Sequence, residues 1–221
     1  MVATLFDFNG VLVDDESVHL AAFREVLAPL GVTFDDATYD ERYLGFDDAG
    51  AFRAMLTDAG KPVTESVVRG LIEAKKPVYM DRIAGSLVIF AGAVQIVRRR
   101  AERGIVGIVS GALRHEIEHC LSVMGVRELV AFIVSAEDTA ACKPDPEGYR
   151  LGLAELARRG APPTAVVIED SIAGLEAARS AGLRCAAVTH SYPAERLRAA
   201  GADVVVATLA ELTDAVLEPA P

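Results

Sequence analysis

Several residue types are scarce in this chain, and each shortage argues against a class of protein. The sequence has no tryptophan and only three cysteines, Cys120, Cys142 and Cys185, which lie far apart and form no CxxC pair. A disulfide framework and a zinc site are therefore disfavoured, and a reducing, cytoplasmic setting is expected. The first residues, MVATLFDF, lack the basic segment of a signal peptide.

Basic residues and long apolar runs are scarce as well. The 22 Lys and Arg against 32 Asp and Glu give a net charge of −10, and an acidic surface repels phosphate backbones, so nucleic acid is not an expected partner. The longest apolar stretch, Leu87–Val97, is too short and too interrupted to span a bilayer. Apolar residues nevertheless make up 52% of the 221 residues, which is enough for a sizeable core. No spare apolar face is evident, so a monomer is expected.

Short runs rich in β-branched residues alternate with helical patterns. The runs VATLF, IVGIVS, LVAFIVSA, AVVIED, CAAVTH and ADVVVAT are largely apolar, which is typical of strands buried on both faces of a parallel sheet. The alternation from Ile105 onward predicts an α/β fold with a Rossmann-like, doubly wound parallel sheet and helices on both faces.

One segment interrupts this alternation. From about Glu16 to Arg82 the sequence shows amphipathic helical periodicity and no strand pattern. We therefore predict an α/β core domain of residues 1–15 and 83–221, with an all-helical cap domain of residues 16–82 inserted after the first strand. Such an insert would lie above the carboxyl edge of the sheet, where ligands bind in open α/β folds, and could act as a lid.

Polar side chains occur at the carboxyl ends of three predicted strands and in one loop that follows a fourth. They are Asp7 and Asn9 after the first strand, Ser110 and Gly111 after IVGIVS, Lys143 in the loop ACKPDPEGY, and Glu169 and Asp170 at the end of AVVIED. Each has an ordinary alternative as a helix cap, a turn residue or a surface lysine. The carboxyl ends of parallel strands share one edge of a sheet, however, so together these residues predict a site there.

The chemistry of this set fits phosphoryl transfer. Asp7 is a candidate carboxylate nucleophile. Three carboxylates beside a phosphate need cations, and Mg²⁺ bound through oxygen is the usual solution. Lys143 would add a fixed positive charge, and the Ser110 hydroxyl with the Gly111 N–H would donate to phosphoryl oxygens. A small phosphorylated metabolite is the expected partner.

The same stretches resemble a known family. DFNGVLVDDES, IVSGA, the lysine of CKPDPEGY and VIEDSIAGLEAARSAG are similar to the four motifs of the haloacid dehalogenase-like (HAD) hydrolases. The resemblance covers nearly the whole chain. More narrowly, the stretches resemble the branch with a helical cap, which includes β-phosphoglucomutase and many sugar-phosphate phosphatases. It implies that Asp7 forms an aspartyl phosphate and that Ser110 and Lys143 bind phosphate. The Mg²⁺ ligands that it implies are Asp7, the Asn9 backbone carbonyl, Asp170 and, directly or through water, Glu169.

Asn9, the only asparagine in the chain, departs from that pattern. The family normally has an Asp there that serves as general acid and base, and an amide cannot exchange that proton near neutral pH. Loss of a general acid typically costs about 10²–10⁴ in rate. Three explanations stay open: Asp15 or His19 supplies the proton, the substrate has a good leaving group, or the protein binds phosphorylated ligands with little turnover.

The predicted cap bears on the substrate. The mutase uses a basic cap residue for a second phosphate, whereas this chain has Asp47 and Asp48 in the corresponding stretch, which would repel one. We therefore favour a phosphatase of small phosphate monoesters that resemble sugar phosphates over a β-phosphoglucomutase-like phosphotransferase. Asp15, His19, Lys76 and its neighbour Lys75 are candidates for contacting the substrate from the cap.

Overall fold

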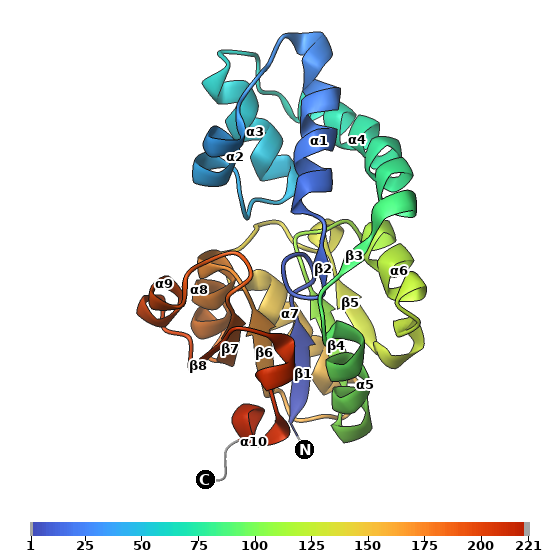
Figure 1. The fold of residues 1–221 in the computed structure, drawn as a ribbon, viewed down its shortest axis with the longest axis vertical. Coiled ribbons are helices and arrows are strands. Elements are labelled where there is room, and N and C mark those ends of the chain that lie inside the picture. The colour runs from blue at the N-terminus through green and yellow to red at the C-terminus, as the bar shows by residue number, and fades with distance from the viewer. Residues whose placement is uncertain (1, 219–221) are drawn as a thin grey trace. The chain divides into compact units, whose positions relative to one another are not determined.

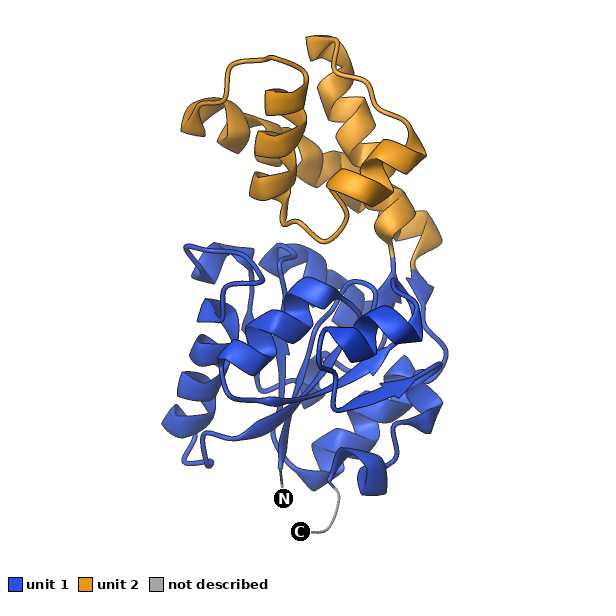
Figure 2. Ribbon diagram, turned by 90° about the vertical axis from the view of Figure 1, so that its left-hand side faces the viewer, with its two compact units in different colours: residues 1–14, 88–221 blue, residues 15–87 orange. Residues whose placement is uncertain are grey.

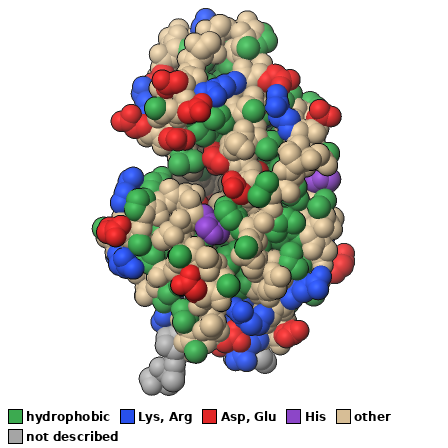
Figure 3. Space-filling model, viewed as in Figure 1, with side chains coloured by type: hydrophobic (Ala, Val, Ile, Leu, Met, Phe, Trp, Pro, Cys, Tyr) green, Lys and Arg blue, Asp and Glu red, His purple; other side chains and the backbone are tan. Residues whose placement is uncertain are grey.

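The structure, a computed structural model, describes residues 2–218. The chain forms two compact units, shown in different colours in Figure 2. Unit 1 comprises the residues up to Asp14 and those from Val88 onward, and unit 2 comprises Asp15–Leu87. On the face shown in Figure 3, charged side chains of both signs are dispersed over each unit.

Unit 1 is built on one parallel sheet. Its strand order is β5-β4-β1-β6-β7-β8, and every neighbouring pair is parallel. The strands are β1 (Ala3–Phe6), β4 (Val106–Val109), β5 (Phe132–Val134), β6 (Ala165–Glu169), β7 (Arg184–Val188) and β8 (Val204–Val206). Phe6 at the end of β1 pairs with Ile108 of β4 and with Ile168 of β6. The carboxyl ends of these three central strands are therefore level with one another.

Helices cover both faces of this sheet (Figure 1). They are α5 (Ala93–Arg103), α6 (Arg114–Val123), α7 (Glu147–Arg158), α8 (Ile172–Ser180), α9 (Ala194–Ala199) and α10 (Asp214–Leu217), with 3-10 turns η2 (Arg127–Leu129), η3 (Ala136–Asp138) and η4 (Leu209–Glu211). Leu5, Val109 and Val167 pack with α7 and α8. On the other face, the buried Arg100 of α5 donates to the Thr4 hydroxyl at 2.8 Å. Because both faces are covered, the strands carry apolar residues without alternation. The predicted Rossmann-like doubly wound fold with an inserted helical segment is confirmed.

Two short strands that were not predicted lie where the chain leaves and re-enters unit 1. They are β2 (Val13–Asp14) and β3 (Val88–Ile89), and they pair antiparallel to each other. The two-stranded ribbon brings the outgoing and returning segments side by side. Both strands are too short for a periodic pattern to be visible in the sequence.

Unit 2 is all helical, with α1 (Glu16–Leu27), η1 (Ala28–Leu30), α2 (Asp36–Arg42), α3 (Asp48–Asp58) and α4 (Glu65–Ser86). Its core gathers Phe23 and Leu27 of α1, Tyr39 of α2, Phe52 and Met55 of α3, and Val68 and Leu71 of α4. Side chains cap the helices, as when Asp47 accepts from the Gly50 N–H at 2.7 Å. The domain boundary expected at residue 83 falls inside α4, because this helix continues to Ser86.

Candidate active site

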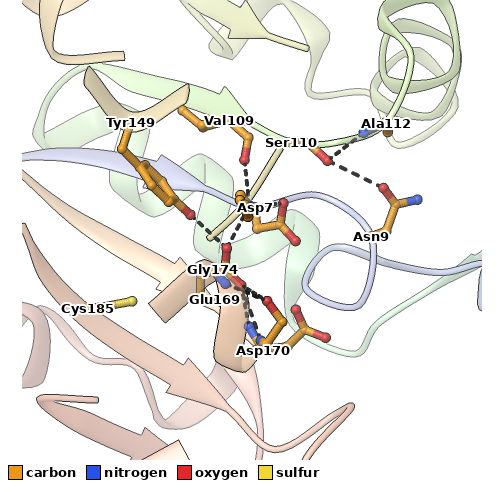
Figure 4. A network of polar contacts seen from close by, with 12 residues as sticks. Asp7, Asn9, Val109, Ser110, Ala112, Tyr149, Glu169, Asp170, Gly174 and Cys185 are labelled. Atoms are coloured by element: carbon orange, nitrogen blue, oxygen red, sulfur yellow. Dashed lines mark hydrogen bonds and ion pairs between the residues drawn. The ribbon is translucent and has the colours of Figure 1, made fainter. Parts of the chain in front are cut away.

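The carboxyl edge of the sheet brings together polar residues from three neighbouring strands (Figure 4). Asp7 follows β1 and its N–H donates to the Ile168 carbonyl of β6 at 2.9 Å. Ser110 follows β4, and Glu169 is the last residue of β6. The level strand ends thus place side chains that are more than 100 positions apart in the sequence within one network.

Lys143 is the cation at the centre of this network. Its ammonium donates to Asp7 Oδ1 at 2.7 Å, to Glu169 Oε1 at 2.6 Å and to the Val109 carbonyl at 3.1 Å. An ammonium has three N–H donors, so all of them are used. Lys143 is thus no surface lysine: it neutralises part of the acidic charge and holds Oδ1 of Asp7 in place.

Both oxygens of Glu169 already accept hydrogen bonds. Oε1 accepts from Lys143 and from the Tyr149 hydroxyl, the latter at 2.8 Å. Oε2 accepts from the N–H of Asp170 and from the N–H and hydroxyl of Ser171. This carboxylate is also enclosed, because a Cβ on Gly174 would lie 1.8 Å from Oε1. Glu169 is therefore anchored by the protein, which favours the water-mediated form of its expected contact with a metal.

The Asn9 side chain lies at the same edge. Its Oδ1 accepts from the Ser110 hydroxyl at 3.4 Å, and Ser110 Oγ in turn accepts from the Ala112 N–H at 3.2 Å. Gly111, between these two, is exposed. The structure therefore brings Asp7, Asn9 and Ser110 together with Lys143, as the sequence led us to expect.

Burial and charge shift the acidic groups in different directions. Burial, with the nearby Glu169 carboxylate, raises the pKa of Asp7 to about 6 although Lys143 opposes the shift. Burial and the nearby carboxylates of Glu169 and Asp7 raise the pKa of Asp170 well above its ordinary value. Burial also acts to raise the pKa of Glu169, but the charge of Lys143 and the hydrogen bonds from Lys143, Tyr149 and Ser171 together outweigh it, and the pKa is lowered. Two carboxyls thus lack enough positive charge to ionise readily.

The residues present fit a hard divalent cation. One oxygen each from Asp7, Glu169 and Asp170 lies within 4.8 Å of the others, and carboxylate and carbonyl oxygens are the ligands that Mg²⁺ prefers. Asp7 and Asp170, with the Asn9 carbonyl, are the groups that would hold the ion. A bound cation would supply the charge that these two carboxyls lack.

We expect the stabilisation by Mg²⁺ to depend steeply on pH. The folded-state pKa of Asp7 is raised, so the stability from its protonated form is present below its ordinary pKa and is lost as pH rises through about 6. A cation must displace that proton. Mg²⁺ affinity should therefore fall about tenfold per pH unit below about 6.

Thermal midpoints with and without Mg²⁺ from pH 5 to pH 8, at matched ionic strength, measure this effect. The gain should be large at pH 8 and clearly smaller at pH 5. An equal gain at both ends of the range would contradict it.

The remaining expected site residues belong to unit 2. Asp15 is fully buried and accepts from the Tyr79 hydroxyl, and it is also paired with His19 at 3.3 Å. Lys75 was expected to reach the substrate, but it is fully buried and bound within the unit to His19 Nδ1 at 2.7 Å and to Asp48 Oδ1 at 2.6 Å.

This network corrects two expectations about unit 2. Because Lys75 neutralises Asp48 and Asp47 caps α3, these acids are not two free carboxylates, and they give less reason to exclude a second phosphate. Lys76, unlike the buried Lys75, lies on the surface and pairs with Glu73 at 2.6 Å.

Sequence reasoning missed Tyr149, His190 and Ser191. Tyr149 is fully buried and donates to Glu169. It lies within the motif CKPDPEGY, but nothing in the motif indicates that its hydroxyl turns inward. His190 and Ser191 follow β7, which neighbours β6 in the sheet. No polar residue after β7 was proposed from the sequence.

Comparison with known proteins agrees with this geometry. The model of the haloacid dehalogenase-like hydrolases matches residues 1–182. The chain belongs to this family. The predicted resemblance, and with it the expectation of an enzyme of this hydrolase family, is confirmed.

Its relatives include named phosphatases. It is 28% identical over 209 residues to validoxylamine A 7'-phosphate phosphatase from Streptomyces hygroscopicus subsp. limoneus, covering 94% of each chain. It is 30% identical to protein CbbY from Cereibacter sphaeroides, covering 95% of this chain and 93% of the relative.

Solved structures show the same architecture. CbbY from Rhodobacter sphaeroides in complex with phosphate is 28% identical with a TM-score of 0.85, covering 98% of this chain and 99% of that one. An Asp-to-Asn variant of it, in complex with xylulose-(1,5)bisphosphate, is 29% identical with a TM-score of 0.83 and the same coverage. A β-phosphoglucomutase from Clostridium difficile, 23% identical with a TM-score of 0.83, covers 97% of this chain and 94% of that one and shows the fold alone. No helix among residues 2–218 combines the length and the apolar character needed to cross a membrane.

Proposed function

We propose that the protein is a Mg²⁺-dependent phosphatase that hydrolyses small, sugar-phosphate-like monoesters through an aspartyl phosphate on Asp7. The observation that carries the proposal is the Asp7 carboxylate at the level ends of three parallel strands, with one oxygen held by Lys143 at 2.7 Å. A second carboxyl that lacks compensating charge, that of Asp170, shares the site. This combination suits a nucleophile that works beside a divalent cation.

The proposed reaction has two steps. Asp7 Oδ2 attacks the phosphorus atom, the bond to the ester oxygen breaks, and the leaving alkoxide takes up a proton. Water then attacks the aspartyl phosphate, which releases inorganic phosphate and restores the carboxylate. The Ser110 hydroxyl and the Gly111 N–H bind the phosphoryl oxygens, and Lys143 binds them by exchanging one of its three present acceptors for a phosphoryl oxygen. A bound Mg²⁺ would neutralise part of the phosphoryl charge.

Asn9 cannot protonate the leaving group in the first step. Its backbone carbonyl can serve the cation, but its amide has no proton to give to the leaving group. Asp15 and His19 are proposed as substitutes for that acid, and with Lys76 as substrate contacts from unit 2. Their hydrogen bonds to each other and to Tyr79 within that unit mean that either would act as a member of a network.

The names of the relatives support the substrate class. Validoxylamine A 7'-phosphate phosphatase acts by its name on a small phosphorylated compound. A β-phosphoglucomutase-like phosphotransferase is the second candidate, because Lys75 neutralises Asp48 and lowers the barrier to a second phosphate. A binder of phosphorylated ligands is the third, and an Asp-to-Asn variant of CbbY that holds a sugar bisphosphate shows that such binding occurs in this fold.

Phosphate release tests these candidates. The protein is incubated with Mg²⁺ and sugar phosphates, polyol phosphates, acetyl phosphate or p-nitrophenyl phosphate, with EDTA-treated protein as control. We expect Mg²⁺-dependent release from monophosphates, fastest from acetyl phosphate, because its leaving group needs no acid. Isomerisation of a hexose phosphate without release would favour the phosphotransferase. Tight binding without either reaction would favour the binder.

A further inference from the structure

Two consecutive residues after β7, His190 and Ser191, contact the acidic site from a strand to which no catalytic group is assigned. The Ser191 hydroxyl donates to Asp170 Oδ2. The His190 Nδ1 atom lies 2.7 Å from the Gly10 carbonyl, 180 residues away in the sequence. The loop after β7 thus contacts both a carboxylate and the loop that carries Asn9.

His190 is held in a defined position. Its ring stacks on Phe90, with centroids 3.8 Å apart and an interplanar angle of 14°, and the Phe90 N–H donates to the Leu12 carbonyl at 3.1 Å. Since a carbonyl oxygen only accepts, Nδ1 must carry the proton. The imidazole therefore acts as a fixed N–H donor that joins the Asn9–Gly10 loop to the returning chain at Phe90.

The two contacts meet at one point of the site. Gly10 has φ +73°, and a Cβ there would lie 2.1 Å from Asp170 Oδ2, so the Gly10 backbone passes directly over that carboxylate. His190 holds the backbone on one side, and Ser191 holds the carboxylate on the other. The bond from Ser191 thus fixes the orientation of the Asp170 carboxylate.

We propose that His190 and Ser191 are positioning residues that fix the Asp170 carboxylate and the Asn9–Gly10 loop in the geometry that binds Mg²⁺. The inference rests on the proposed metal-dependent function. Ligating carboxylates depend on hydrogen-bonded partners, whose loss typically costs about 10–100-fold in metal affinity. Because Asn9 offers only its carbonyl, the position of that loop decides whether the carbonyl reaches the ion.

The test is calorimetric titration of Mg²⁺ into the metal-free protein without substrate. Ser191→Ala should weaken Mg²⁺ binding by about tenfold or more, whereas Ser191→Thr, which keeps a hydroxyl, should retain most of the affinity. Ser122→Ala is the matched control, because that hydroxyl bonds to the Glu118 carbonyl in its own helix at 2.7 Å. Its affinity should equal that of the wild type.

A pair of variants separates the two roles of His190. His190→Phe keeps an aromatic ring against Phe90 but has no donor, and it should weaken Mg²⁺ binding. His190→Asn keeps an N–H donor near the position of Nδ1 without the ring, and it should bind Mg²⁺ more tightly than His190→Phe. Thermal midpoints of the metal-free variants identify any that fail to fold, in which case Ser191→Gly and Ser191→Thr provide the comparison.

The outcomes separate this inference from the proposed function. Mg²⁺ affinity that is unchanged in Ser191→Ala and His190→Phe would overturn the inference and leave the proposed function standing. A wild-type protein that binds no Mg²⁺ while releasing phosphate would overturn both the metal and the positioning roles. Weaker binding in both variants, with Ser191→Thr and Ser122→Ala near the wild type, supports the inference.

Discussion

Replacing Asp7 by Asn is expected to abolish phosphate release, lowering kcat by roughly 10⁶, the scale seen when a covalent nucleophile is removed. An amide oxygen is a poor nucleophile, and an aspartyl phosphate cannot form on it. Lys143 can still donate to the amide oxygen, so the local geometry should persist. The loss should therefore appear in kcat, with little change in the affinity for phosphate.

The same substitution is expected to make the metal-free protein more stable at pH 8. Because burial raises the pKa of Asp7 to about 6, the carboxylate that predominates above that pH is less favourable in the folded chain than in the unfolded chain. A shift from the ordinary value corresponds to at most about 3 kcal/mol, and removing the charge should recover part of it. Near pH 4 the two proteins should be equally stable.

Single-turnover kinetics, mass spectrometry of the trapped aspartyl phosphate and thermal midpoints measure these effects. Asp81→Asn, an exposed position on α4, is the matched control and should change none of them. Phosphate release by Asp7→Asn at the wild-type rate would exclude Asp7 as the nucleophile.

Replacing Asn9 by Asp is expected to raise kcat by about 10²–10⁴ for substrates with poor leaving groups, such as sugar phosphates. The two side chains have the same size and shape, and Asn9 already lies at the site, with Oδ1 3.4 Å from the Ser110 hydroxyl. A carboxyl there would sit beside buried carboxylates, so its pKa should be raised toward the range where a general acid works best. Acyl phosphates, which need no acid, should gain little.

Asn9→Ala tests whether a gain in kcat comes from the new carboxylic acid or only from removal of the amide side chain. It keeps the backbone carbonyl for the cation and adds no proton, so it should show no gain over the wild type. If the wild type already turns sugar phosphates over quickly and Asn9→Asp changes nothing, another group carries the proton. If the wild type is inert and Asn9→Asp is active, the natural protein is a binder on an intact phosphatase framework. The Asp7→Asn change is best repeated in the Asn9→Asp background, where the initial rate is higher.

Much of the fold could be predicted because its signals are local. Continuous apolar runs mark strands buried on both faces, and amphipathic periodicity marks helices, since each depends on residues a few positions apart. The boundary at residue 83 was misplaced because a periodic pattern does not show where a long helix ends. β2 and β3 were missed because two residues cannot show a period, and their pairing joins residues 74 and 76 positions apart.

The sequence by itself determined the fold class and the chemical character of the site, namely Asp7, Ser110, Lys143 and the acidic pair at strand ends, because a parallel sheet brings its carboxyl ends to one edge whatever the loops do. It also determined that Asn9 stands where an acid is expected. Only the tertiary structure decided that both oxygens of Glu169 accept hydrogen bonds, from Lys143, Tyr149 and Ser171. It alone also decided that Lys75 neutralises Asp48 inside unit 2. The contacts of His190 and Ser191 with the acidic site, from the loop after β7, are likewise visible only in the tertiary structure. The reason is physical: a side chain's direction and its partner depend on packing between distant segments, which no spacing within one segment encodes.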